Sequence, residues 1–125
     1  MPDSFKILLV EDNDFVRMQI ATYLRDFDCE LIEAREGEEA LQRVSEVGRV
    51  DMAIVDVRME PMGGFDFVRA LRGDNDNTPV VLVTGDQTSD LLEQAAKYNI
   101  TAVLMKPVER DRLLKVVSRT LGVKG

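Results

Sequence analysis

The chain has 125 residues, with 16 Lys and Arg against 23 Asp and Glu and no His, which gives a formal net charge of −7. A composition with 45% hydrophobic and 31% charged residues predicts one packed domain rather than a disordered chain. The acidic balance argues against a free-standing nucleic-acid-binding protein, because affinity for phosphate backbones comes from clustered Lys and Arg. The lack of His excludes Ser-His-Asp and Cys-His catalytic sites and His-ligated zinc.

Cysteine usage and hydropathy indicate where the protein works. Cys29 is the only cysteine of the sequence, so an internal disulfide is impossible and a reducing compartment is expected. The apolar run from Ile7 to Val10 is too short for a signal peptide, and no stretch approaches the roughly 20 apolar residues of a membrane span. We therefore expect a cytoplasmic protein without membrane insertion.

Short apolar runs predict the strands. In chain order they are Lys6 to Val10, Leu31 to Glu33, Met52 to Val55, Val80 to Val83 and Ala102 to Met105. The runs KILLV, MAIV and VVLV are nearly continuous in apolar residues, which is typical of strands covered on both faces and therefore of a parallel sheet.

Apolar residues at helical spacing predict a helix after each of these strands. The expected helical faces are Val16, Ile20, Tyr23, Leu24 and Phe27; Ala40, Leu41 and Val44; Val68 and Leu71; Leu92 and Ala96; and Leu113, Leu114, Val117 and Leu121. Gly122 predicts the end of the last helix. The pattern indicates a single α/β domain over residues 1–125, a doubly wound (βα)5 three-layer fold with right-handed crossovers. A (β/α)8 barrel would need about 250 residues.

Polar residues follow the predicted strands. In a doubly wound sheet, functional sites lie beyond the carboxyl ends of the strands. Glu11, Asp12 and Asn13 follow the first strand, Asp56 the third, Thr84 and Gly85 the fourth, and Lys106 and Pro107 the fifth. The second strand is followed by Ala34, Arg35 and Glu36. The fold therefore gathers carboxylates, a hydroxyl and a lysine at one edge.

Clustered carboxylates suggest metal-assisted phosphoryl chemistry. They repel one another unless a cation or a raised pKa relieves the repulsion, and oxygen ligands suit Mg²⁺. A carboxylate beside Mg²⁺ can act as a nucleophile and form an aspartyl phosphate, while a lysine neutralises the transferred group. Each residue alone also has a structural explanation, since Asp12 or Asn13 could cap a helix that begins near Asp14.

Five segments carry a resemblance to a known family. They are KILLVEDN with Glu11 and Asp12, MAIVD ending in Asp56, VRMEPMGG with Met59, Met62 and Gly64, VVLVTG with Thr84, and VLMKP with Lys106. Together, in this order and at compatible spacing, they resemble the receiver domain of bacterial two-component response regulators. The resemblance covers essentially the whole chain and implies a flavodoxin-like parallel sheet with strand order 2-1-3-4-5.

The resemblance implies a signalling phosphoprotein. A histidine kinase or histidine phosphotransfer protein would transfer a phosphoryl group to Asp56, and the chain would catalyse only its own phosphorylation and dephosphorylation there. Thr84 would be the switch hydroxyl, and Lys106 the cationic partner of the phosphoryl group. The partners would be this phosphodonor and a downstream target protein, without direct contact to nucleic acid, and the chain would be a monomer or a weak dimer.

The resemblance also implies a metal site. Its ligands would be the acidic pair Glu11 and Asp12, with Asp12 the direct ligand, together with Asp56 and the backbone carbonyl of Arg58, and the cofactor would be Mg²⁺. Pro107 would follow a cis peptide bond.

Some positions depart from the family pattern. Glu60 stands where the family often has Pro, and the proline is Pro61, so the loop over the site is expected to turn differently. Val103 replaces the usual Tyr or Phe, which argues against an aromatic rotamer switch. Asn99 occupies a place often held by Gly, and Asn also suits a left-handed helix cap.

The resemblance further implies a responding face. It consists of the helix from about Ser89 to Tyr98, the strand 102–105 and the last helix. Because Val103 has no ring to swing, we expect the backbone from Thr84 to Ser89 to carry most of the change. Arg58 and Asp86, two residues past Asp56 and Thr84, are expected to pair across the mouth of the site and restrict the attacking water.

Alternative readings remain open. The chain could be a pseudo-receiver that acts as an adaptor without phosphorylation, or the receiver part of a longer regulator with an output domain, although a stand-alone regulator is favoured. An aspartyl-nucleophile phosphatase generally has a second Asp two residues after the nucleophile, where this chain has Arg58.

Overall fold

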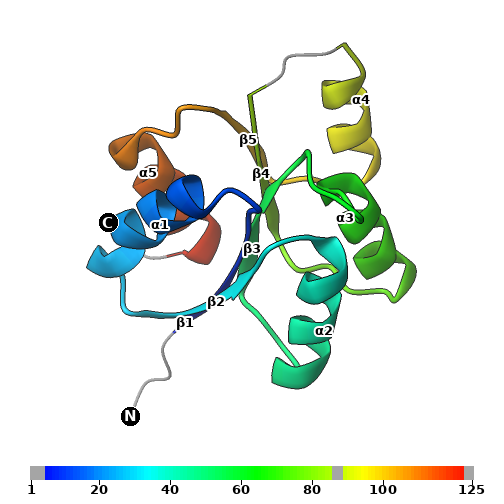
Figure 1. Ribbon diagram of the computed structural model, residues 1–125, viewed down its shortest axis with the longest axis horizontal. Helices are drawn as coiled ribbons and strands as arrows, with labels where there is room; N and C mark the ends of the chain where they lie inside the picture. The colour runs from blue at the N-terminus through cyan, green and yellow to red at the C-terminus, as the bar shows by residue number, and fades with distance from the viewer. Residues whose placement is uncertain (1–4, 86–88, 123–125) are drawn as a thin grey trace.

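The computed structural model describes residues 5–85 and 89–122, which form a five-stranded parallel sheet covered on both faces by helices (Figure 1). The strands are β1 (Phe5–Val10), β2 (Cys29–Ala34), β3 (Met52–Asp56), β4 (Val80–Thr84) and β5 (Ala102–Met105). Their order is β2-β1-β3-β4-β5, and every neighbouring pair is parallel. The expected fold class and strand order are confirmed.

The helices form two layers. They are α1 (Asp14–Tyr23), the 3₁₀ turn η1 (Leu24–Asp26), α2 (Gly37–Val47), α3 (Gly64–Gly73), α4 (Ser89–Lys97) and α5 (Arg110–Leu121). Helices α1 and α5 cover one face of the sheet, and α2, α3 and α4 cover the other (Figure 1). Within the described residues, no helix has the length and apolar character needed to cross a bilayer.

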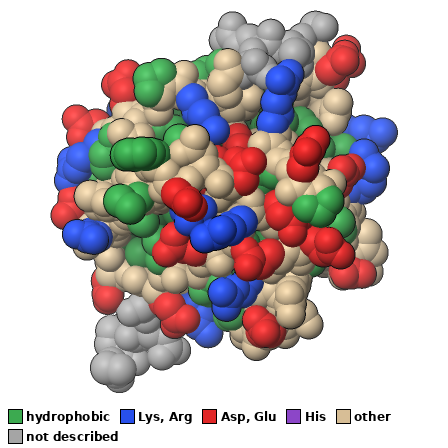
Figure 2. Space-filling model, viewed as in Figure 1, with side chains coloured by type: hydrophobic (Ala, Val, Ile, Leu, Met, Phe, Trp, Pro, Cys, Tyr) green, Lys and Arg blue, Asp and Glu red, His purple; other side chains and the backbone are tan. Residues whose placement is uncertain are grey.

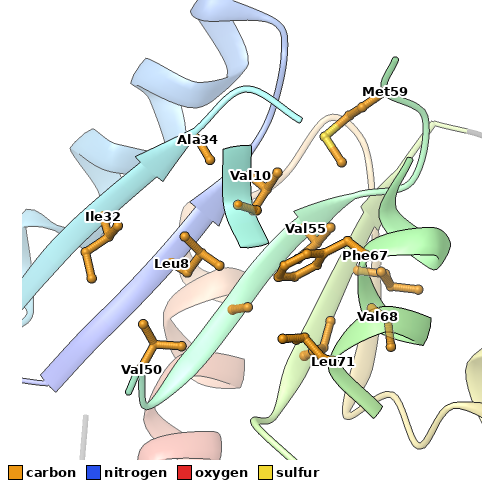
Figure 3. Packing of buried hydrophobic residues seen from close by; sticks show 14 residues of the cluster. Leu8, Val10, Ile32, Ala34, Val50, Val55, Met59, Phe67, Val68 and Leu71 are labelled. Carbon is orange, nitrogen blue, oxygen red and sulfur yellow. The ribbon is translucent and has the colours of Figure 1, made fainter. Parts of the chain in front are cut away.

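Strand residues alternate between two hydrophobic cores, because side chains along a strand have a period of two. On β1, Leu8 belongs to the core under α2 and α3, whereas Ile7 and Leu9 belong to the core under α1 and α5. In the first of these cores, Phe67 of α3 is fully buried and lies against Val55 of β3 (Figure 3). Strands β3 and β4 are buried along their whole length, as expected for strands covered on both faces.

The apolar face that the sequence predicts for α4 is not the buried one. Leu91 and Ala95 are buried, whereas Leu92 is 71% exposed and Ala96 is exposed. The segment contains two adjacent apolar pairs with the same spacing of four residues, so periodicity alone cannot choose between them. Packing against the rest of the fold selects the pair one residue earlier and leaves Leu92 on the surface.

The C-terminal end of α4 is fastened to α3 by Arg72. Its guanidinium donates to the carbonyl oxygens of Tyr98 at 2.9 Å, Asp76 at 2.8 Å, Thr78 at 3.0 Å and Asn99 at 3.4 Å. Asn99 has a φ of 57°, which is the left-handed cap expected for Asn at this position. One cation therefore joins the end of α3, the end of α4 and the entry of β4.

Replacing Arg72 with Ala should lower the free energy of unfolding by about 2 kcal/mol, because several part-buried carbonyls lose a charged donor. Urea denaturation measures the change. Arg69→Ala is the matched control, since Arg69 lies on the same helix with a side chain that is 61% exposed, and it should lower stability by less than about 1 kcal/mol. Equal losses in the two variants would contradict the role of Arg72.

Candidate functional site

Glu11, Asp56 and Lys106 meet at the carboxyl edge of the sheet because strand alternation directs them to the same side. Each continues a series that faces the core under α1 and α5: Ile7 and Leu9 on β1, Met52 and Ile54 on β3, and Leu104 on β5. Strands β1 and β3 are neighbours, whereas β5 is separated from β3 by β4. Lys106 therefore spans two strand spacings, roughly 10 Å, with the longest of the three side chains.

One ammonium group lies between two buried carboxylates. Lys106 Nζ is 3.0 Å from Glu11 Oε1 and 3.2 Å from Asp56 Oδ1. Glu11 is 1% exposed and Asp56 is 5% exposed. With these three groups ionised the cluster carries a charge of −1, and the adjacent carboxylate of Asp12 makes it −2. The net negative charge of the cluster therefore favours the binding of a further cation.

Burial dominates the electrostatics of Glu11. It raises the pKa of this carboxyl to about 7, although the Asn13 N–H and the Lys106 ammonium act in the opposite direction, and the charge of Asp56 adds to the rise. The Asn13 N–H donates to Glu11 Oε2 at 3.1 Å. Burial alone would lower the pKa of Lys106, but its contacts with Glu11 and Asp56 outweigh burial and raise it.

The acidic cluster fits a divalent metal ion. Glu11, Asp12 and Asp56 each offer one oxygen, and these atoms lie within 4.8 Å of one another. Within the described part of the chain, Glu11 Oε1 is buried and accepts no well-directed hydrogen bond, although Lys106 lies beside it. Asp12 is exposed, so an ion here would stay in contact with water, as Mg²⁺ usually does.

Asn13, rather than Asp12, caps α1. Its side-chain oxygen accepts hydrogen bonds from Phe15 N at 2.9 Å and Val16 N at 3.1 Å. The sequence left both candidates open, because Asp and Asn are equally good N-caps. Since Asn13 takes this role, the carboxylate of Asp12 is left to line the cleft.

The remaining expected residues lie around the same cleft. It is lined by Glu11, Asp12, Asn13, Asp56, Arg58, Thr84, Gly85 and Lys106. Thr84 is 2% exposed at the end of β4, and its carbonyl accepts a hydrogen bond from Lys106 N at 2.8 Å. Thr84 continues the series of Leu82, which faces the core under α2 and α3. Asp86, the expected partner of Arg58, lies outside the described residues, so that pairing stays a prediction.

The loop between β3 and α3 is docked on α2 through contacts that the sequence analysis missed. Glu36 caps α2, and its carboxylate also accepts a hydrogen bond from Met62 N at 3.3 Å. Gly37 N donates to Met62 O at 2.9 Å, and Met59 of the same loop is buried in the core (Figure 3). Glu36 gave no sequence signal, because helix caps are usually Ser, Thr, Asp, Asn or Gly.

Two prolines near the site follow cis peptide bonds. The bond before Pro107 is cis, as expected from the sequence. The bond between Glu60 and Pro61 is also cis, and it lies in the loop where the proline is displaced by one residue from the family pattern.

Gly64 permits the close approach of α3 to the phosphoacceptor candidate. A Cβ at this position would overlap the carbonyl oxygen of Asp56, which is backbone and cannot move independently. Gly64 N also donates to Val57 O at 3.0 Å. Only a glycine therefore fits where α3 begins against the end of β3.

Gly64→Ala should lower the free energy of unfolding by about 1–3 kcal/mol, because the added methyl group forces a backbone shift at Asp56. Gly73→Ala is the control: its methyl group would meet nothing within 4 Å, so stability should stay the same or rise slightly. Urea denaturation of both variants gives the comparison. If Gly64→Ala were as stable as Gly73→Ala, the close packing at Asp56 would be disproved.

Comparison with known proteins gives consistent matches. A family model described as the response regulator receiver domain matches residues 7–118. The chain is 32% identical over 124 residues to the chemotaxis protein CheY of Pseudomonas aeruginosa, an alignment that covers 94% of this chain and 99% of that protein. The solved structure of the chemotaxis protein CheY4 of Vibrio cholerae has a TM-score of 0.87 and 31% identity, and the match covers 95% of this chain and 100% of that one.

Other relatives are longer. The chain is 35% identical over 109 residues to a response regulator receiver protein of Anaeromyxobacter, covering 87% of this chain and 45% of that protein. It is 29% identical over 116 residues to the autoinducer sensor kinase/phosphatase CqsS of Vibrio cholerae, covering 90% of this chain and 17% of that protein. The chain thus spans less than half the length of these two curated relatives.

Proposed function

This chain belongs to the response regulator receiver family, and we propose that it is the phosphoacceptor module of a two-component system, with Asp56 as the phosphorylated residue. The observation that carries the proposal is the buried contact of Lys106 with both Asp56 and Glu11 at the carboxyl edge of the sheet. Receiver domains are signalling modules rather than enzymes acting on other substrates. In this proposal residues 1–125 form one receiver domain, located in the cytoplasm.

In the transfer step a carboxylate oxygen of Asp56 attacks phosphorus. The new bond is an acyl phosphate, and the bond from phosphorus to the nitrogen of the donor's phosphohistidine breaks, so that its electron pair leaves with the donor. Lys106 is held close to Asp56 and partly screened from water, where its charge stabilises developing negative charge strongly. In the separate dephosphorylation step, water attacks phosphorus, the bond to the Asp56 oxygen breaks with its electron pair on the carboxylate, and inorganic phosphate is released. Pairing of Arg58 with Asp86 would slow this second step by restricting the water.

The receiver family binds Mg²⁺ through acidic residues, and we assign Glu11, Asp12, Asp56 and the carbonyl of Arg58 as the ligands in this chain. When bound, Mg²⁺ neutralises charge on the phosphoryl oxygens. Glu11 has a second role, since it holds the Lys106 ammonium beside the phosphoacceptor. Asp12 lies at the exposed side of the cluster and would bind the ion from the side that faces water.

We assign the response to the face formed by α4, β5 and α5. Thr84 is the switch hydroxyl in this proposal, and its movement toward a phosphoryl group would displace the segment that joins β4 to α4. Arg72 holds the opposite end of α4, so the displacement is expected at the N-terminal end of the helix. Val103 is only half-buried and has no ring, which agrees with a change carried by the backbone.

The partners follow from this assignment. The phosphodonor is a histidine kinase or histidine phosphotransfer protein, and the output is a downstream target protein rather than nucleic acid. Leu92, exposed on α4, offers the target an apolar contact on the responding face. Charged side chains of both signs are interspersed over the face of the molecule seen in Figure 2. A monomer or weak dimer is sufficient for this function.

Acetyl phosphate with Mg²⁺ should add one phosphoryl group to the chain, measured as intact mass. Asp56→Asn should abolish the gain because a neutral amide replaces the carboxylate nucleophile. Asp51→Asn is the matched control: it changes a carboxylate at the opposite end of β3 and should leave labelling unchanged. Labelling that persists in Asp56→Asn would assign a different acceptor. A wild-type chain that is never labelled would favour a phosphorylation-independent adaptor.

Beryllofluoride, a phosphoryl mimic, should change amide chemical shifts most strongly outside the site in α4, β5 and α5. Within α4 the shifts near Asp90 should exceed those near Lys97, because Arg72 fastens the C-terminal end. Two-dimensional amide spectra with and without the mimic provide the measurement. Larger shifts in α1 or α2 than in α4 would show that the responding face is assigned incorrectly.

A further inference from the structure

We propose that Arg17 is a positioning residue for the metal site: by binding the carbonyl oxygen of Glu11, it fixes the peptide that carries Asp12. This inference rests on the proposed function, because it assigns a role toward the same Mg²⁺ site. Arg17 lies on α1, outside the cleft. Its guanidinium pairs with Asp14 and Glu33, neither of which is a proposed metal ligand.

The guanidinium of Arg17 is held at each of its three nitrogens. Nη1 donates to Glu11 O at 2.9 Å, Nη2 to Asp14 Oδ1 at 2.5 Å, and Nε to Glu33 Oε1 at 3.1 Å. The side chain is only 14% exposed. A planar fork with three separate partners has a fixed orientation, which a lysine cannot reproduce. Arg17 is therefore a rigid support under the end of β1.

The supported carbonyl belongs to the peptide that joins the two acidic residues. The peptide unit is planar, so fixing the oxygen of Glu11 also fixes the nitrogen of Asp12 and limits where its Cα lies. The same segment is held before this peptide by Glu11 N, which donates to Ala34 O at 3.0 Å, and after it by Asn13, which caps α1. Arg17 supplies the side-chain contact to the peptide between these two points.

Geometry and charge predict opposite effects for Arg17. A positive charge near a cation site disfavours the cation, so removing it would strengthen Mg²⁺ binding if charge were its only influence. Two carboxylates, Asp14 and Glu33, already pair with the guanidinium. Burial opposes the charged form of Arg17, but these carboxylates keep its pKa above the usual value. We therefore expect the geometric effect to be the larger one.

The test is a titration of the full chain with MgCl₂, followed by the amide shifts of residues around the acidic cluster. Arg17→Lys, which keeps the charge, and Arg17→Gln, which removes it, should each weaken Mg²⁺ binding by about tenfold, as is typical when a residue that orients a metal ligand is lost. Arg25→Gln is the control, because it removes an exposed positive charge from η1, the turn that follows α1. The Mg²⁺ affinity of this variant should change less than twofold. Asp12→Ala shows that the shifts report this site.

A second measurement separates positioning from general damage. The Mg²⁺ concentration that gives half-maximal labelling by acetyl phosphate should rise in Arg17→Lys, while the rate at saturating Mg²⁺ stays near that of the wild type. If Arg17→Gln fails to fold, Glu33→Gln loosens the Nε contact instead and should weaken Mg²⁺ binding by a smaller factor.

The outcomes are distinct. Affinities equal to or tighter than wild type in both Arg17→Lys and Arg17→Gln would overturn the positioning role while leaving the proposed function intact. A wild-type chain that binds no Mg²⁺ and is not labelled would instead overturn the proposed function.

Discussion

The contact of Lys106 with Glu11 and Asp56 is the interaction on which the functional edge of the molecule depends. Two carboxylates that are almost fully buried are strongly unfavourable unless a cation pairs with them. The cation directly follows β5, on the far side of β4, so the pairing exists only when β1, β3, β4 and β5 have assembled. The central strands thus position Asp56, and the lysine that follows edge strand β5 makes its burial tolerable.

The loops around this charged centre are held mainly by backbone contacts. Glu36 accepts a hydrogen bond from the backbone N–H of Met62, and Gly37 donates one to the backbone carbonyl of Met62. Gly64 allows α3 to begin against Asp56. On the other side, Asn13 starts α1 without using a carboxylate of the site. Helix capping and loop docking therefore fall to groups beside the cluster, while Glu11 and Asp56 at its centre pair with Lys106.

Periodicity predicts the architecture because buried parallel strands and amphipathic helices have distinct repeats, and the topology then brings Glu11, Asp56 and Lys106 to one edge. It does not predict the inner face of α4, where Leu91 and Leu92 fit the same repeat. Nor does it reveal the contact of Arg17 with the Glu11 carbonyl or of Glu36 with Met62 N, since these backbone atoms come close to the side chains only in the tertiary fold. Long-range contacts to backbone leave no mark on the sequence.

The clamp at Arg72 gives α4 the mechanics of a lever with its fulcrum at the C-terminal end. The helix has nine residues, so it is roughly 13 Å long at a rise of about 1.5 Å per residue. A tilt of about 10° around the C-terminal end would move the N-terminal end of α4 by roughly 2 Å, whereas the middle of the helix would move about half as far. Leu92 rides on the outer half of this arm. In the proposed response, a small movement beside Asp56 would thereby displace an exposed apolar side chain at a distance from the charge that caused it.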